Sequence, residues 1–132
     1  MPEKLIGADP EFWLSSAILR MSGGNDFDPG ARAEYSRCFS DPATIAASCA
    51  DYRAAATVDL EHDDATALTA AKITCPTLVL WGDRGLVGHH YNVLDVWREY
   101  ANDVRGMGLP AGHFIAEEAP GETHAALRDF LG

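Results

Sequence analysis

Hydrophobic residues in the first half of the chain recur at helical spacing. They follow each of three Asp-Pro dipeptides, at positions 9, 28 and 41, and the first of these segments ends at Gly23-Gly24. Asp is a favoured helix cap, Pro is favoured at the first helical position and Gly ends helices. Residues 59–72 carry a weaker pattern of the same period. The pattern therefore predicts helices over most of residues 1–72.

From residue 73 onward, the pattern predicts strands and helices in alternation. Residues 77–81 form an uninterrupted apolar run, which is typical of a strand buried on both faces. A helix with hydrophobic positions at 93, 94, 97 and 101 follows, then a weaker strand over residues 104–109 and a final helix that begins near Glu117. The predicted fold class is α/β, with a helical segment over residues 1–72 and a β-α-β-α segment over residues 73–132.

Two strands of this kind do not form a free-standing sheet. Each strand keeps an unpaired edge, and a hydrophobic strand requires covering on both faces. Either a partner supplies further strands, or the chain is the carboxyl-terminal part of a larger fold.

The composition narrows the classes of function. There are 20 acidic and 10 basic residues, so the formal net charge is −10 at pH 7. This charge argues against binding to nucleic acids or to anionic membranes, because both depend on Lys and Arg. Cys38, Cys49 and Cys75 match no metal-binding spacing, and we expect reduced thiols. We find no signal sequence, membrane-spanning stretch or cofactor motif, and expect a cytoplasmic location without a metal or cofactor.

Two residues with catalytic potential follow the predicted strands. Asp83 comes shortly after the first strand and His113 shortly after the second. Because ligands bind beyond the carboxyl ends of parallel strands, neighbouring strands would bring these residues together. A carboxylate that orients an imidazole base is part of a hydrolytic triad. The alternative is that Asp83 caps a turn and His113 is an ordinary loop residue, and the spacing leaves both interpretations open.

The pattern identifies no nucleophile. A nucleophile elbow requires a glycine two positions before the reactive residue and another two positions after it. No serine or cysteine meets this requirement, and Asp83 is followed by Gly85 but preceded by Trp81. The sequence therefore contains a candidate base and a candidate acid without a recognisable nucleophile.

The second half of the chain contains four distinctive segments: PTLVLWGDRG at 76–85, VWRE at 96–99, GHF at 112–114 and EEAP at 117–120. These segments resemble the end of α/β-hydrolases of the haloacetate (fluoroacetate) dehalogenase type. In the first half, CADYRAA and DLEHD resemble the later part of that family's helical cap. The resemblance implies that the chain is the carboxyl-terminal portion of such an enzyme.

The resemblance also implies a division of the chain. Residues 1–72 would be a helical cap segment, and residues 73–132 would be the carboxyl-terminal strand-helix units of the α/β-hydrolase core. The family's first six strands, its nucleophilic aspartate and the arginines that hold the substrate carboxylate would then lie upstream of Met1.

The family's chemistry implies roles for three residues. An aspartate displaces halide from the substrate carbon to form an ester, and a histidine activates the water that hydrolyses this ester. The resemblance places His113 as this base and Tyr52 as a halide-binding residue that donates to the leaving fluoride. Periodicity puts Tyr52 on one helix face with Ile45 and Cys49, so a buried structural tyrosine is the alternative. Asp83 is either the triad acid or structural, because enzymes of this type carry the acid after the preceding strand.

The predicted function follows from these roles. The chain resembles part of a haloacetate dehalogenase, would act on a small haloacid substrate within the complete fold, and is expected to be inactive alone. Whether the chain by itself is an enzyme stays open. One alternative is a non-catalytic helical module that forms a homodimer or complements a separate amino-terminal chain. Another is a split or prematurely started reading frame.

Overall fold

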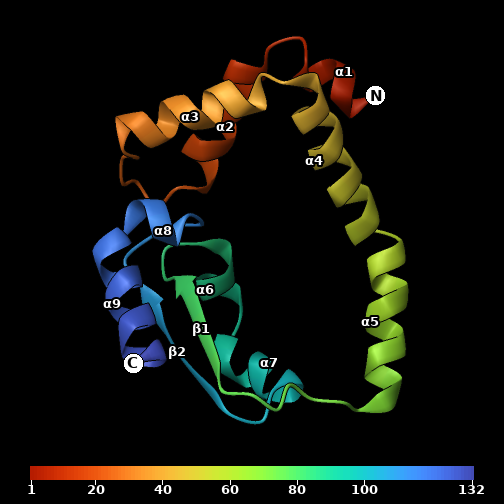
Figure 1. Cartoon of the computed structure of the whole chain (residues 1–132), viewed down its shortest axis with the longest axis vertical. Helices are drawn as coiled ribbons and strands as arrows, with labels where there is room; N and C mark the ends of the chain where they lie inside the picture. The colour runs from red at the N-terminus through yellow and green to blue at the C-terminus, as the bar shows by residue number, and fades with distance from the viewer. The chain divides into compact units, whose positions relative to one another are not determined.

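The chain divides into two compact units in a computed structural model that describes all 132 residues (Figure 1). The first unit comprises residues 1–18 and 29–71, and the second comprises residues 19–28 and 72–132. The helices up to residue 71 are α1 (Pro2–Ile6), α2 (Pro10–Met21), α3 (Pro29–Phe39), α4 (Pro42–Ala55) and α5 (Val58–Thr69). The remaining elements are β1 (Thr77–Gly82), α6 (Leu86–His90), α7 (Val93–Tyr100), β2 (Val104–Leu109), α8 (Ile115–Glu118) and α9 (Pro120–Leu131).

The helix starts predicted from the Asp-Pro dipeptides are confirmed, since α2, α3 and α4 each begin at the proline. Asp9 Oδ1 accepts a hydrogen bond from the Phe12 amide at 3.0 Å. Asp41 Oδ1 likewise accepts one from the Ala43 amide at 2.8 Å. These side chains satisfy amides that have no partner within the first turn of a helix, so the starts of α2 and α4 are fixed locally.

The first unit has a small hydrophobic core. Ile6 on α1 and two α4 residues, Ile45 and Cys49, are buried, and Phe39 packs against them. No residue of α2, α3 or α5 is buried within the structure. The core of this unit is therefore limited to the place where α1, the end of α3 and the first half of α4 meet.

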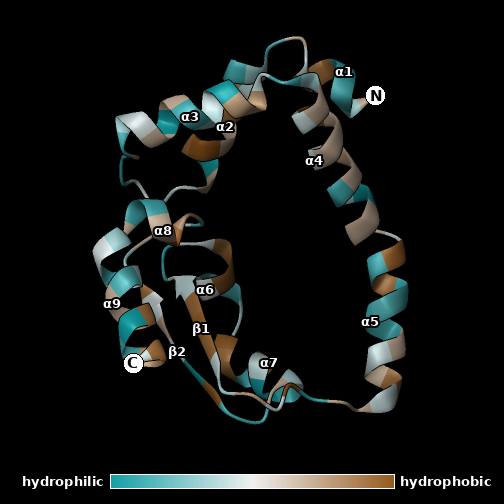
Figure 2. Cartoon of the chain, in the orientation of Figure 1, coloured by the Kyte–Doolittle hydropathy of each residue, from teal (hydrophilic) through white to brown (hydrophobic).

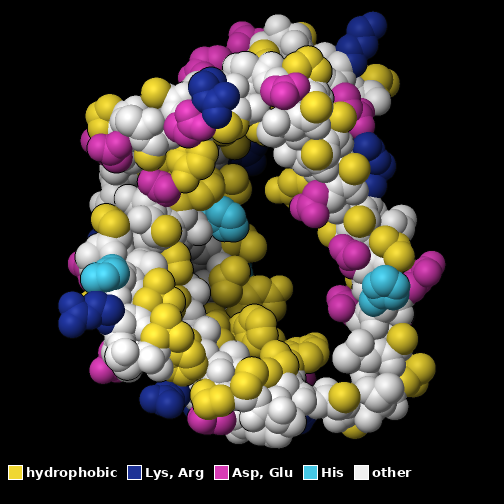
Figure 3. Space-filling model, viewed as in Figure 1, with side chains coloured by type: hydrophobic (Ala, Val, Ile, Leu, Met, Phe, Trp, Pro, Cys, Tyr) yellow, Lys and Arg dark blue, Asp and Glu magenta, His cyan; other side chains and the backbone are white.

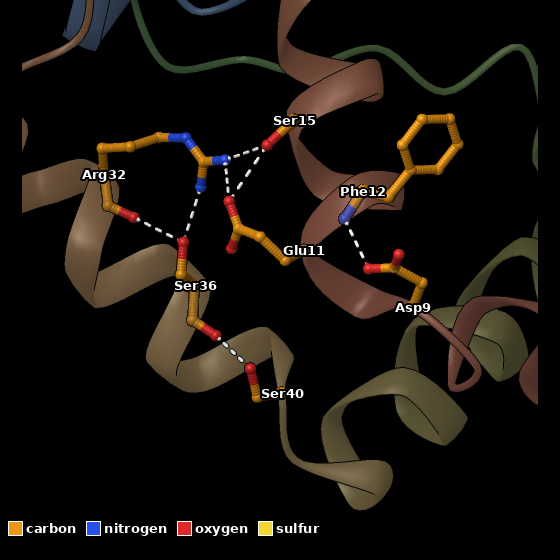
Figure 4. Close-up of polar contacts among 7 residues, drawn as sticks. All are labelled: Asp9, Glu11, Phe12, Ser15, Arg32, Ser36 and Ser40. Atoms are coloured by element: carbon orange, nitrogen blue, oxygen red, sulfur yellow. Dashed lines mark hydrogen bonds and ion pairs between the residues drawn. The ribbon is translucent and has the colours of Figure 1, made fainter.

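A polar network joins α2 to α3 (Figure 4). The Arg32 guanidinium on α3 donates to Glu11 Oε1 at 2.6 Å and to Ser15 Oγ, both on α2. It also donates to Ser36 Oγ on its own helix at 2.7 Å. Charged hydrogen bonds are stronger than neutral ones, and this network joins two helices that lack buried residues.

The second unit contains a parallel two-stranded sheet of β1 and β2, as predicted. Its register runs from Thr77 opposite Val104 to Gly82 opposite Leu109. β1 is strongly hydrophobic (Figure 2), yet only Val79 and Gly82 are buried within it. The expectation of a strand buried on both faces is therefore wrong for this chain. A sheet of two strands has too few neighbouring elements to cover both faces.

Other local features complete the description of the fold. Residues 2–6 form a short helix that the pattern did not indicate. His89 and His90 end α6, which starts after Gly85, and a new helix begins after Asn92. Residues 19–28 group with the second unit. No helix combines the length and the hydrophobicity that a membrane crossing requires.

Candidate functional site

The loop that carries His113 packs against the end of β1. This histidine loop comprises residues 110–114, between β2 and α8. The Asp83 amide donates to Leu109 O at 2.9 Å, and the Arg84 amide donates to Ala111 O at 3.0 Å. A Cβ added at Gly82 would lie 1.6 Å from Gly112 O, so only glycine permits this approach of two backbones. The carboxyl ends of both strands therefore meet at the histidine loop.

Glu118, the last residue of α8, binds the backbone of this loop. Glu118 is only 8% exposed. The carboxylate accepts hydrogen bonds at 3.1 Å from the amides of Gly112 and Phe114, which flank His113. It also accepts one from the Gly23 amide. These bonds satisfy the buried carboxylate without any cationic partner within ion-pair distance.

The segment between α2 and α3 contacts the histidine loop from another side. The His113 amide donates to Met21 O at 2.9 Å. Asn25 Nδ2 donates to Pro110 O and to Glu118 O, each at 3.1 Å. The Phe27 ring meets the Phe114 ring edge to face, with centroids 5.2 Å apart. Residues far apart in sequence thus fix the backbone of the loop.

The side chain of His113 is exposed. Its imidazole lies edge to face with Phe114, with ring centroids 5.0 Å apart and an interplanar angle of 87°. Asp83, with a side chain that is 55% exposed, has Arg84 as its nearest cation, at 4.0 Å. No hydrogen bond joins Asp83 to His113, although their loops are in contact. The structure therefore brings the two predicted residues to the same edge of the sheet without pairing their side chains.

Tyr52 lies on α4 in the first unit and is 78% exposed, while Ile45 and Cys49 on the same helix are buried. Tyr52 is therefore not the buried structural tyrosine that the periodicity offered as an alternative. The core of the unit ends near Cys49, and residues 50–57 are all exposed except the half-buried Ala54. Periodicity placed the three residues on one face, but no neighbouring element covers the second half of that face.

Sequence reasoning missed the role of Glu118. The sequence shows Glu117 and Glu118 just before a helix, where acidic residues are favoured by the helix dipole. Nothing in the local pattern distinguishes the two residues, because the partners of Glu118 include Gly23, which is 95 positions away. The structure also contains no group of three or more His, Cys, Asp or Glu residues that could hold a metal ion.

Comparison with known proteins gives consistent relatives. No family model matches the chain. It is 37% identical over 132 residues to the fluoroacetate dehalogenase of Burkholderia sp, covering 98% of this chain and 43% of that protein. It is 32% identical over 120 residues to the soluble epoxide hydrolase of Corynebacterium sp. (strain C12), covering 88% of this chain and 40% of that protein.

A solved structure agrees with these relatives. A protein from Nostoc sp PCC 7120, assigned to the α/β-hydrolases, superposes with a TM-score of 0.91 at 54% identity, covering 99% of this chain and 45% of that one. The chain thus spans less than half the length of the proteins it matches. The fold is that of the carboxyl-terminal part of an α/β-hydrolase, and the sequence is similar to those of a fluoroacetate dehalogenase and an epoxide hydrolase.

Proposed function

We propose that this chain supplies the catalytic base, His113, and part of the helical cap of a hydrolase that cleaves the carbon–halogen bond of a small haloacid. The observation that carries the proposal is the position of His113, in a loop fixed by backbone contacts at the carboxyl ends of two parallel strands. Ligands of open α/β sheets bind at this edge. The similarity to a fluoroacetate dehalogenase over nearly the whole chain supports a haloacid as the substrate.

In the proposed reaction, an aspartate that this chain does not supply attacks the carbon that bears the halogen. The carbon–halogen bond breaks, halide leaves with the electron pair, and an ester forms. His113 then takes a proton from water while the water oxygen attacks the ester carbonyl. Collapse of this intermediate releases the hydroxyacid and restores the carboxylate, and the proton on His113 returns to solvent.

Tyr52 is proposed as the residue that binds the departing halide. Its hydroxyl would donate a hydrogen bond to fluoride, which carries full negative charge only after the bond breaks. The exposure of Tyr52 supports this role, since the hydroxyl has no partner within the chain that would compete for its proton. Asp83 is the candidate triad acid, with a structural role in the turn after β1 as its alternative.

The first test measures fluoride release from fluoroacetate by the chain alone. Loss of the nucleophile from a catalytic triad removes roughly six orders of magnitude of rate, so we expect no release above that of His113→Ala. Release that depends on His113 would show that a carboxylate of this chain is the nucleophile.

The second test restores the missing part. In a chimera, this chain replaces the matching segment of the Burkholderia fluoroacetate dehalogenase, which is 37% identical. We expect fluoride release that His113→Ala abolishes. Tyr52→Phe should reduce it by about 10²-fold to 10³-fold, and by less with chloroacetate, whose leaving group needs less assistance. A folded chimera in which His113→Ala keeps full activity would refute the proposed role of His113.

The chimera also decides the role of Asp83. Replacing the acid of a triad by its amide lowers kcat by about 10⁴-fold in the best-studied case. Asp83→Asn should have this effect if Asp83 orients His113, and an effect of less than about tenfold if Asp83 is structural. Glu122→Gln, on the exposed first turn of α9, is the matched control for a lost carboxylate.

A non-catalytic role in partner binding is the second candidate. Large hydrophobic side chains are exposed on the surface (Figure 3), among them Leu5, Phe12, Leu19, Leu68, Leu86 and Leu131. Both strands of the sheet also have one edge without a partner. Exposed hydrophobic surface and open strand edges favour association, either as a homodimer or with a separate amino-terminal chain. Light scattering after size-exclusion chromatography would show a compact dimer in the first case and a monomer or aggregates otherwise.

A further inference from the structure

We propose that Glu118 is a positioning residue for His113, which acts through the backbone of the histidine loop and through the segment of residues 21–25. This inference rests on the proposed function for the importance of His113, but its geometry stands without any activity. The sequence pattern gives no reason to separate Glu118 from Glu117. Burial and hydrogen bonding give that reason.

The first step of the argument concerns the two amides that flank His113. Both Glu118 carboxylate oxygens lie 3.1 Å from the Gly112 amide, and Oε1 lies 3.1 Å from the Phe114 amide. A residue whose neighbours on both sides are held by one rigid acceptor has little freedom in its own backbone dihedral angles. The direction in which the His113 side chain leaves the backbone is therefore set largely by the Glu118 carboxylate.

The second step concerns the segment of residues 21–25. Gly23 donates its amide to the same carboxylate, and the His113 amide donates to Met21 O. A Cβ added at Gly112 would lie 2.2 Å from the Gly23 nitrogen, and one added at Gly23 would lie 2.5 Å from the Gly112 nitrogen. The two glycines permit the close contact that lets one carboxylate bind both segments.

The third step concerns the orientation of the His113 imidazole ring. Phe114, whose amide Glu118 binds, lies edge to face with the His113 ring and with Phe27. Edge-to-face pairs have preferred geometries, so the orientation of Phe114 favours one placement of the neighbouring imidazole. The Glu118 carboxylate thus controls the backbone of His113 directly and its ring through Phe114.

A purely structural role would also make Glu118 important for stability, so the test requires a local readout. NMR on the full chain supplies two: amide hydrogen exchange at Gly112 and Phe114, and nuclear Overhauser contacts between the His113 and Phe114 rings. In Glu118→Ala, we expect exchange at these amides to be about 10-fold to 100-fold faster, because hydrogen bonds to a charged acceptor are lost. The contacts between the two rings should weaken as well.

The conservative variant and the controls sharpen this test. Glu118→Gln keeps one acceptor oxygen of similar reach, so it should restore part of the amide protection and part of the ring contacts. Glu122→Gln should change neither readout. Unchanged ring contacts and exchange in a folded Glu118→Ala chain would overturn the proposal, as would unprotected Gly112 and Phe114 amides in the unmodified chain.

A second variant perturbs the histidine loop without changing Glu118. Gly23→Ala forces the segment away from Gly112, whereas Gly121→Ala places its methyl group where nothing lies within 4 Å. We expect Gly23→Ala alone to weaken the contacts between the His113 and Phe114 rings. If Glu118→Ala fails to fold, unchanged contacts in Gly23→Ala overturn the proposal. Neither readout depends on fluoride release, so a failure of the proposed function would be recognised separately in the chimera.

Discussion

Within each of the two units of the chain, a different kind of contact stabilises the fold. The first unit has three buried hydrophobic residues with Phe39 packed against them, and a network of polar side chains joins its helices α2 and α3. In the second unit, the backbones of sequence-distant segments are joined directly, as at Gly82 and Gly112 or at Met21 and His113. The side chains that could perform chemistry at the sheet edge, Asp83 and His113, are in this second unit.

This difference in contacts shows that a candidate site requires a more exact backbone geometry than a group of exposed helices does. Backbone hydrogen bonds at a close contact depend on the placement of every atom in the loop, so they define one geometry and tolerate little change. Contacts between exposed helices involve flexible side chains and tolerate rearrangement. Four measurements test whether the two units differ in this way.

The largest effect is expected at the close contact in the second unit. Gly82→Ala would place a methyl carbon 1.6 Å from Gly112 O, and neither backbone can move without breaking the bonds of the histidine loop. We expect a loss of more than about 3 kcal/mol of unfolding free energy. Urea unfolding followed by the indole N–H resonance of Trp81 measures this loss. Gly121→Ala should gain up to about 1 kcal/mol, and equal effects of the two variants would contradict the comparison.

The core of the first unit should give a smaller effect. Ile45 is 2% exposed, and Ile45→Ala removes the centre of the Ile6, Ile45 and Cys49 cluster. We expect a loss of about 2–3 kcal/mol, in the lower part of the usual range because an open core can collapse around the cavity. Unfolding followed by the indole N–H resonance of Trp13 reports on this unit. Leu68→Ala, at a residue that is 89% exposed, is the control and should have little effect.

The polar network between α2 and α3 comes next. Arg32→Gln removes the charge that binds Glu11, together with the donors to Ser15 and Ser36. Amide exchange in α2 and α3 should become about fivefold faster. Arg37→Gln on the same helix breaks contacts with Glu34 and Cys38 of that helix alone, and should change exchange by less than about twofold. Larger effects at Arg37 would show that the network does not join the helices.

The smallest effect is a pH dependence in the first unit. Hydrogen bonds from its own backbone amide and from Arg53 lower the pKa of Glu3 from 4.5 to about 2. Because the folded state stabilises the carboxylate, its contribution is complete above pH 4.5 and is lost as the pH falls toward about 2. Far-ultraviolet circular dichroism should show a helix loss in this window that Arg53→Gln moves to higher pH. Identical profiles in both chains would exclude the Glu3–Arg53 contact.

The elements of the fold were predictable wherever short-range rules decide the structure. The Asp-Pro dipeptides give the starts of α2, α3 and α4, because a cap and its amides lie within a few residues. The positions of β1 and β2 were also predictable, and the two strands pair in the predicted parallel arrangement. The short helix α1 and the true start of α6 escaped prediction because neither carries a clear periodic pattern.

The candidate site was predictable only in part. Its residues could be named from their places after the strands, as His113 and Asp83 were. The exposure of Tyr52 could not be predicted, because periodicity tells which residues share a face and not whether another element covers it. The partial burial of β1 could not be predicted for the same reason, since burial depends on neighbouring elements that the local sequence does not describe.

Short-range sequence rules were enough to locate the starts of α2, α3 and α4 and to place His113 after a strand, since these features depend on residues a few positions apart. The binding of the histidine loop by Glu118 and the grouping of residues 19–28 with the second unit depend on the folded chain as a whole. The reason is physical: a buried carboxylate must find donors wherever the folded backbone places them, and one of its donors, Gly23, is 95 positions away along the chain.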